Sequence, residues 1–180
     1  MNLPNKITLL RVVLIPAFLV VYLANPIGGI PNEWLALVLF VIAAVTDAVD
    51  GYLARRLGLV TNFGKLMDPL ADKMLVCAAF IAFTAAGMLP AWATIILISR
   101  EFYISGLRQL ALEQKIVVAA SGSAKIKTAM QITLIIYILL PYPFSELYFA
   151  PVALALIIVT TIISVYSAAE YTYKNKLVFG

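Results

Sequence analysis

The sequence predicts an all-α, polytopic membrane protein with six transmembrane helices and both termini in the cytoplasm. Hydrophobic residues make up 63% of its 180 residues, and the mean hydropathy is +1.01. A soluble globule could not cover this much apolar surface with polar side chains, so the solvent is expected to be largely lipid. The alternating segments of about ten residues that build membrane barrels do not occur in the sequence, which favours helices.

Six apolar stretches give the predicted elements in order. They cover residues 7–24, 34–46, 74–89, 91–112, 128–141 and 148–167. The second stretch is short, but apart from Gly51 no helix breaker follows before Gly58, so its helix is predicted to continue into the cytoplasm. The first stretch lacks the cleavage site of a signal peptide and is interpreted as a retained span. Residues 1–180 are interpreted as one transmembrane domain.

The basic residues predict the orientation. All thirteen Lys and Arg lie at or toward one face of the six-span arrangement, and the opposite loops near 25–33, 88–91 and 141–147 contain none. By the positive-inside rule the basic face is cytoplasmic. The predicted location is therefore the plasma membrane, with a multi-pass chain whose active site lies at the cytoplasmic face. The net charge of +4 then reflects topology and attraction to anionic lipid or phosphate, without nucleic acid as a partner.

The residue types that are missing exclude several kinds of chemistry. The chain has no His and a single Cys, Cys77. This excludes zinc sites with imidazole ligands, Ser-His-Asp triads and an internal disulfide. Acid–base or metal chemistry must therefore depend on carboxylates, Lys, Tyr or hydroxyl groups.

Four aspartates are concentrated in the segment "TDAVDGYLARRLGLVTNFGKLMDPLADK", residues 46–73. Asp47 and Asp50 are three residues apart and Asp68 and Asp72 are four apart, so each pair shares one face of a helix. The short connection between the two helices brings the pairs together at the cytoplasmic boundary. Four carboxylates would repel one another there unless a cation lay between them. Mg²⁺ or Mn²⁺ is the expected ion, and two ions bridging a phosphate-bearing substrate would suit four carboxylates.

A purely structural role is the alternative for these acids. They could be solvated and paired with neighbouring bases, and Asp68, directly before Pro69, has the sequence of a helix N-cap. Asp47 fits that interpretation less well, because it precedes a helix C-terminus, where negative charge opposes the dipole. Gly51 is expected where a ligand or another helix approaches closely.

The segment resembles the signature of the CDP-alcohol phosphotransferase family at eight fixed positions. These are Asp47, Asp50, Gly51, Ala54, Arg55, Gly64, Asp68 and Asp72. The resemblance implies an enzyme that uses two divalent metal ions to transfer a phosphatidyl or similar group from a CDP-linked donor to an alcohol, releasing CMP.

The same resemblance implies roles for individual residues. Asp47, Asp50, Asp68 and Asp72 would hold the ions, and Asp72 would also take the proton of the attacking hydroxyl. The residues implied in donor binding are Gly51, Arg55, Thr61 and Gly64. Asn5 and Thr8 would help to line the same site.

Four bases further along the chain predict a site for the acceptor. Arg100 is about nine residues into its span, or about 14 Å, and a cation at that depth normally faces a partner or a watery cavity. Glu101, its neighbour in sequence, is expected to point elsewhere. Arg108 lies two turns on, and Lys125 and Lys127 begin the next helix. We expect these bases to bind a phosphate of the acceptor, although Lys127 could instead be an interfacial anchor.

Within the family, the blocks "NLPNKITLLRVVLIPAF", "REF...SGLR" and "KIKT" resemble members whose donor is CDP-diacylglycerol and whose acceptor is sn-glycerol 3-phosphate. Other acceptors, such as an inositol phosphate, serine or phosphatidylglycerol, remain alternatives. The resemblance also implies a homodimer. A divalent cation transporter is the competing class of protein, but acids at one boundary and the lack of an internal repeat favour an enzyme. Near the C-terminus, Glu170 is expected to pair with Lys174.

Overall fold

The computed structural model describes residues 3–24, 32–57, 62–114, 122–140 and 146–176. Within these residues, side chains are described at 10, 12–24, 32–46, 70–71, 73–114, 122–140 and 150–176. The described part of the chain contains six α-helices and no strand. The predicted all-α class and the number of helices are therefore confirmed.

Each helix follows a predicted apolar stretch and extends beyond it at one end or both, although α1, α3 and α5 end before their stretches do. They are α1 (Leu3–Leu23), α2 (Asn32–Leu57), α3 (Asn62–Ala85), α4 (Ala91–Glu113), α5 (Gly122–Leu139) and α6 (Glu146–Lys174). As predicted, α2 continues past its apolar stretch and ends at Leu57. Contacts divide the chain into two compact units, of which the first contains α1–α3 and the second contains α4, α6 and nearly all of α5.

The N-cap interpretation of Asp68 is wrong. Helix α3 begins at Asn62 and continues through Asp68 and Pro69. Proline also lies inside α1 and α6, at Pro16 and Pro151. Proline can lie inside a helix when neighbouring groups compensate for the lost backbone hydrogen bond, so a proline was a poor marker for a helix start in this chain.

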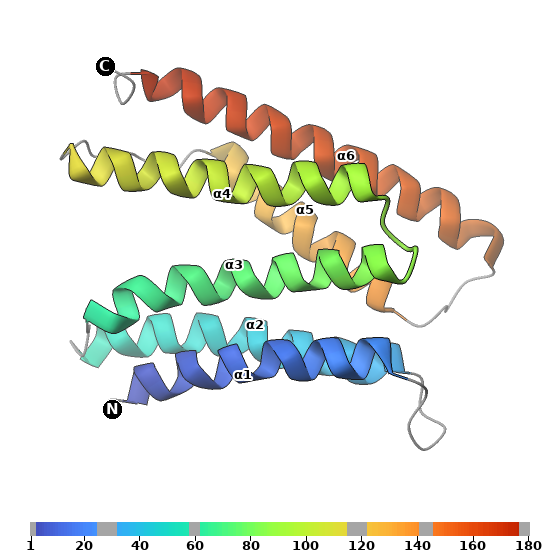
Figure 1. Ribbon diagram of the computed structural model, residues 1–180, viewed down its shortest axis with the longest axis horizontal. Coiled ribbons are helices and arrows are strands. Elements are labelled where there is room, and N and C mark those ends of the chain that lie inside the picture. Colours follow the sequence, from blue (N-terminus) through green and yellow to red (C-terminus); the bar gives the residue numbers. More distant parts are fainter. Residues whose placement is uncertain (1–2, 25–31, 58–61, 115–121, 141–145, 177–180) are drawn as a thin grey trace. The chain divides into compact units, whose positions relative to one another are not determined.

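In the first unit, α1 packs against both α2 and α3 (Figure 1). Phe18 of α1 is fully buried, stacks on Tyr22 with 6.0 Å between ring centroids, and lies 6.3 Å from the ring of Phe40 on α2. Tyr22 in turn meets the ring of Phe83 on α3 edge-on at 5.3 Å. These aromatic contacts join all three helices and are each worth about 1 kcal/mol beyond area burial.

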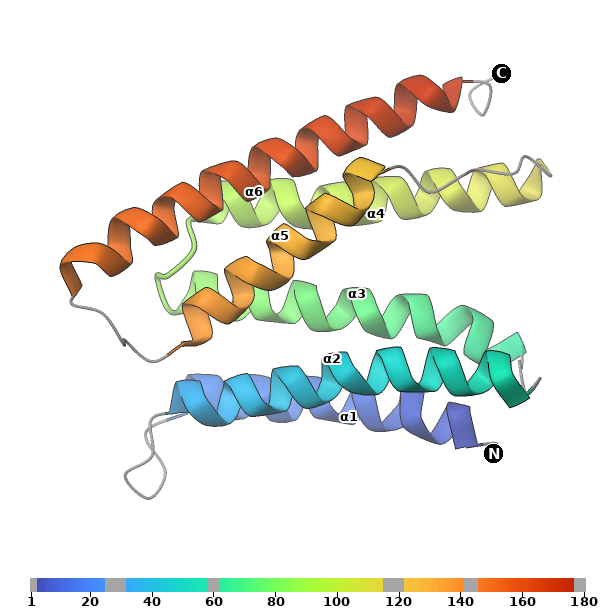
Figure 2. The same ribbon diagram turned by 180° about the vertical axis from the view of Figure 1, so that it is seen from behind.

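In the second unit, α4 lies alongside α6 (Figures 1 and 2). Small hydroxyl residues of α6 are completely buried, namely Thr160, Ser164 and Ser167. Small residues allow helices to approach closely, which is the usual packing mode of helices in lipid. Polar side chains of α5 contact both α4 and α6.

Helix α4 begins after a turn that depends on one glycine. Gly87 has a φ of 74°, a left-handed conformation that is strained for residues with a Cβ. Pro90 follows in extended conformation at the start of α4.

Among the described residues, one helix is long and apolar enough to cross a membrane, Ala150–Lys174 of α6. Shorter apolar segments lie in the first unit at Val12–Leu23, Asn32–Thr46 and Lys73–Ala85. Charged residues interrupt the apolar sequence of α4, which contains Arg100, Glu101 and Arg108.

Candidate active site

The four aspartates lie on two consecutive helices. Asp47 and Asp50 are on α2, and Asp68 and Asp72 are on α3. The two helices contact each other and are joined only by residues 58–61. The predicted pairing of the two motif halves on neighbouring helices is therefore confirmed, while the side chains of all four aspartates lie outside the described residues.

The helix ends place the four positions at matching depths. Asp47 lies ten residues before Leu57, and Asp72 lies ten residues after Asn62, which is about 15 Å along each helix. Asp50 and Asp68 lie seven and six residues from the same ends, or about 10 Å. Because the two helices are antiparallel, Asp47 and Asp72 lie at one depth and Asp50 and Asp68 lie at a second depth, closer to the connection.

The predicted donor residues belong to the same part of the chain. Gly51 and Arg55 are on α2 and Gly64 is on α3, whereas Thr61 lies in the connection outside the described residues. Nothing is described of the side chains of Arg55, or of Asn5 and Thr8 on α1. Their proposed contacts with the donor remain predictions.

Two of the four predicted acceptor bases are buried in a polar network of the second unit. Arg100 is 8% exposed and Lys127 is 4% exposed. The Arg100 Nη2 donates to Ser167 Oγ on α6 at 2.9 Å. Lys127 on α5 forms an ion pair with Glu101, whose Oε1 also accepts a hydrogen bond from Gln131 Nε2 at 3.3 Å.

The expectation that Glu101 points away from Arg100 is wrong. Arg100 Nη1 lies 3.5 Å from Glu101 Oε1, and both side chains are buried. Successive helix positions diverge by about 100°, but the long arginine and glutamate side chains bend around the helix and still meet. Buried carboxylates are normally paired in this way, because an uncompensated charge is costly away from water.

Hydroxyl and carboxylate groups extend this network toward the C-terminal end of α6. Ser123 on α5 donates to Glu170 on α6, and its Oγ lies 3.5 Å from Ser167 Oγ. Glu170 also forms the predicted ion pair with Lys174, which is confirmed. The network therefore links all three helices of the second unit.

The other two predicted bases, Arg108 and Lys125, are exposed. The guanidinium carbon of Arg108 lies 5.7 Å from the centroid of the Tyr171 ring, within the range of a cation–π contact. Tyr171 is buried with Ile104 and Leu107. Arg100 is close enough to both Arg108 and Tyr171 for electrostatic interaction, so the two bases of α4 share one region with this tyrosine.

Sequence reasoning missed Glu101, Gln131, Ser167 and Tyr171 as members of this region. Apart from the contact between Arg100 and Glu101, their partners lie on other helices. Gln131 is 30 residues from Glu101, and Ser167 is 67 residues from Arg100. Of these four residues, only Glu101 could have been found from the sequence, because a carboxylate within a predicted span requires a partner.

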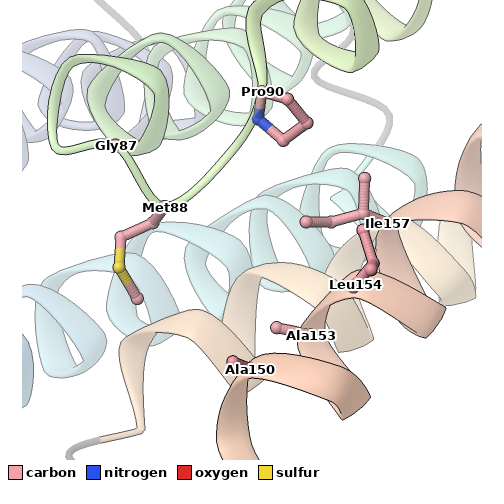
Figure 3. A pocket seen from close by; sticks show the side chains of 7 residues that line it. All are labelled: Gly87, Met88, Pro90, Ala150, Ala153, Leu154 and Ile157. Carbon is pink, nitrogen blue, oxygen red and sulfur yellow. The ribbon is translucent and has the colours of Figure 1, made fainter.

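An apolar pocket of about 310 Å³ lies at the other end of α4 in the second unit (Figure 3). Its lining residues are Gly87, Met88, Pro90, Ala150, Ala153, Leu154 and Ile157. The side chains in Figure 3 are hydrocarbon apart from the Met88 thioether. No lining residue can ionise, so this pocket is unsuited to phosphate chemistry.

A model of the CDP-alcohol phosphatidyltransferase family matches residues 1–166, which include all four aspartates. The chain belongs to this family. A CDP-alcohol phosphatidyltransferase transfers a phosphatidyl group from a CDP-linked donor, and such enzymes generally use divalent metal ions.

The CDP-alcohol phosphatidyltransferase described here is similar to several curated proteins. It is 46% identical to the CDP-diacylglycerol–glycerol-3-phosphate 3-phosphatidyltransferase of Bacillus subtilis strain 168, over 97% of this chain and 95% of the relative. A protein of the same name from Rickettsia felis is 40% identical over 72% of this chain and 70% of its own length. A probable phosphatidylglycerophosphate synthase of Mycobacterium tuberculosis is 37% identical over 91% of this chain and 78% of its own.

Proposed function

We propose that the chain transfers the phosphatidyl group of CDP-diacylglycerol to sn-glycerol 3-phosphate, giving phosphatidylglycerophosphate and CMP. The observation that carries this proposal is the 46% identity to the Bacillus subtilis enzyme over 97% of this chain and 95% of the relative. A likeness that spans nearly all of both chains supports a shared activity for the whole chain.

The reaction exchanges one phosphorus–oxygen bond for another. A hydroxyl oxygen of sn-glycerol 3-phosphate attacks the phosphorus that carries diacylglycerol, and the bond from that phosphorus to CMP breaks. Asp72 accepts the hydroxyl proton, since an alcohol is a poor nucleophile until it is deprotonated. Arg55 offsets negative charge on the CDP group, and Gly51, Thr61 and Gly64 form the rest of the donor site.

The donor set suits hard divalent cations. Asp47, Asp50, Asp68 and Asp72 would hold two ions, Mg²⁺ or Mn²⁺, because carboxylate oxygens are the preferred ligands of these metals. The matching depths of the acids on α2 and α3 support such a shared site. When bound, the ions would neutralise the charge of the donor pyrophosphate and of the departing CMP.

The exposed bases are the better candidates for direct contact with the acceptor phosphate. Arg108 and Lys125 are exposed, whereas Arg100 and Lys127 are buried and have protein partners. The buried pair adds positive charge to the region, since Glu101 can offset only one of the two cations. A net positive, partly desolvated site favours a dianionic acceptor over serine or another zwitterion.

The whole molecule is proposed to be a multi-pass protein of the plasma membrane. All six helices cross the bilayer in this proposal, with both termini and the active site at the cytoplasmic face. The apolar helix at Ala150–Lys174 and the one-sided distribution of Lys and Arg support it. A homodimer is proposed on family resemblance.

The deciding experiment measures CMP release by the purified protein with CDP-diacylglycerol, Mg²⁺ and a panel of acceptors. We expect release with sn-glycerol 3-phosphate and none with serine, phosphatidylglycerol or an inositol phosphate. EDTA should stop the reaction, and Mg²⁺ or Mn²⁺ should restore it. Release with a different acceptor alone would reassign the substrate, and no release with any acceptor would overturn the proposed reaction.

A further inference from the structure

Tyr171 of α6 has a buried hydroxyl group with no hydrogen-bond partner in the described part of the chain. The residue is 2% exposed, and its ring packs against Ile104 and Leu107 of α4. A buried hydroxyl without a partner destabilises a protein, and phenylalanine would fill the same apolar space without that cost.

A second unsatisfied polar group lies in the same region. Arg100 Nε is buried and likewise has no partner among the described residues, although Arg100 Nη2 is bonded to Ser167. Arg100 also lies near both Tyr171 and Arg108. Because arginine can only donate hydrogen bonds, the missing partner in this region is a group that accepts them.

The ring of Tyr171 also fixes an exposed cation. Arg108 is held 5.7 Å from the ring centroid, and this contact limits the positions available to a long, otherwise flexible side chain. Arg108 has a partner for the flat face of its guanidinium, while the edge of the group, with its N–H donors, remains suited to binding an anion.

We propose that Tyr171 is a further residue of the acceptor site, where its hydroxyl donates to a phosphate oxygen of the acceptor and its ring positions Arg108 for the same phosphate. The inference rests on the proposed function, because it assumes that the acceptor carries a phosphate. The unsatisfied Arg100 Nε shows that this region lacks an acceptor group. A phosphate therefore satisfies the Tyr171 hydroxyl and neutralises the exposed cation.

The test compares Tyr171→Phe, which removes only the hydroxyl, with Tyr103→Phe. Tyr103 is on α4, is exposed, and forms a 3.0 Å hydrogen bond through its hydroxyl to Thr172 on α6, so it is a matched control in the same pair of helices. For Tyr171→Phe we expect KM for sn-glycerol 3-phosphate to rise about tenfold, with kcat and KM for CDP-diacylglycerol close to those of the wild type. Tyr103→Phe should leave all three constants near wild type.

The role of the ring is tested by Tyr171→Leu with and without Arg108→Ala. In an otherwise wild-type chain, Tyr171→Leu should raise the acceptor KM about threefold more than Tyr171→Phe, because the cation–π contact is also lost. In the Arg108→Ala background that additional increase should disappear, since the ring acts through Arg108. An additional increase that persists there would assign the ring to packing alone.

Thermal unfolding with and without sn-glycerol 3-phosphate gives a readout that does not depend on turnover. The acceptor should stabilise the wild type and Tyr103→Phe, and it should stabilise Tyr171→Phe markedly less. Wild-type protein that releases no CMP with sn-glycerol 3-phosphate would overturn the proposed function. Active wild-type protein with unchanged acceptor KM and stabilisation in Tyr171→Phe would overturn only the role of Tyr171.

Discussion

Arg100 and Lys127 are buried within a network of protein partners, whereas Arg108 and Lys125 are exposed. The four were predicted as one group because all are bases in or beside predicted spans. Burial separates them, since a cation that already has a carboxylate or hydroxyl partner is less available to a substrate. At the scale of the residue, we therefore expect direct effects on the substrate from the exposed pair.

Replacing Arg108 by Ala should raise KM for sn-glycerol 3-phosphate about 10- to 100-fold, because a charge-assisted hydrogen bond contributes about 1.5–3 kcal/mol. KM for CDP-diacylglycerol should change much less. Steady-state CMP release at varied concentrations of each substrate measures both constants. Lys176→Ala is the control, because Lys176 also lies over a tyrosine ring, 5.9 Å from that of Tyr173. Equal increases for donor and acceptor would give Arg108 a general structural role.

Replacing Asp72 by Asn should lower turnover by about 100- to 10,000-fold, the usual contribution of a general base. Binding of CDP-diacylglycerol should largely survive, because the other three aspartates remain. Single-turnover CMP release measures the first quantity, and direct binding of the donor measures the second. Glu113→Gln removes an exposed carboxylate of α4 and should have no effect. Turnover of Asp72→Asn at the wild-type rate would exclude Asp72 as the base.

At the scale of the helix, Glu101 is the residue that joins α4 to α5. Its carboxylate pairs with Lys127 and accepts a hydrogen bond from Gln131, while the adjacent Arg100 joins α4 to Ser167 of α6. All five side chains are buried. Polar contacts between helices thus supplement the small-residue packing of α6 in this unit.

Glu101→Gln should lower the thermal stability of the protein, because Lys127 loses its carboxylate partner in a buried environment. Removing one member of a buried ion pair costs about 3–5 kcal/mol, whereas replacing both members by apolar residues is often neutral. The double variant Glu101→Met with Lys127→Met should therefore recover part of the loss, since only the buried Arg100 then lacks its carboxylate partner. Thermal unfolding in detergent measures both, with Glu113→Gln as the exposed control on the same helix. A double variant no more stable than Glu101→Gln would contradict this account.

The helices could be predicted from the sequence because apolar stretches bounded by Pro, Gly and charged residues mark them. The ends of the helices were harder to predict. Helix α3 begins at Asn62, well before its apolar stretch, and α6 continues to Lys174. Charged and polar residues in these extensions carry no periodic apolar signal, but a helix continues wherever nothing interrupts its backbone hydrogen bonds.

The aspartate site was accessible to sequence reasoning because spacing within one helix fixes which positions share a face. The network around Glu101 and Tyr171 was not, because it depends on how α4, α5 and α6 cross. Tyr171 is 63 residues from Arg108, and no local pattern indicates that the two side chains meet. Geometry between helices has to be observed.

At the scale of the whole molecule, the length of α4 agrees with the proposed topology. Its 23 residues extend for about 34 Å, slightly more than the hydrocarbon thickness of about 30 Å. Its first turn follows Gly87 and its last residue is Glu113. In the proposed topology these two ends lie on opposite sides of the membrane.

Single cysteines in a Cys77→Ser background test this arrangement. Ala86→Cys should react with a membrane-impermeant maleimide in intact cells, because the turn between α3 and α4 is predicted to face outward. Glu113→Cys should react only after the membrane is permeabilised. Both positions are exposed, so burial cannot explain a difference between them. Labelling of both from the same side would overturn the six-span topology.

The buried network has a consequence for how the chain is made. Arg100 and Glu101 on α4 find their partners on α5 and α6, at Lys127, Gln131 and Ser167, all of which leave the ribosome later. In the proposed topology a newly inserted α4 would expose these charges to lipid, which is costly. Insertion of α4 should therefore be completed only together with α5 and α6, so a chain truncated before α5 would hold α4 in the bilayer poorly.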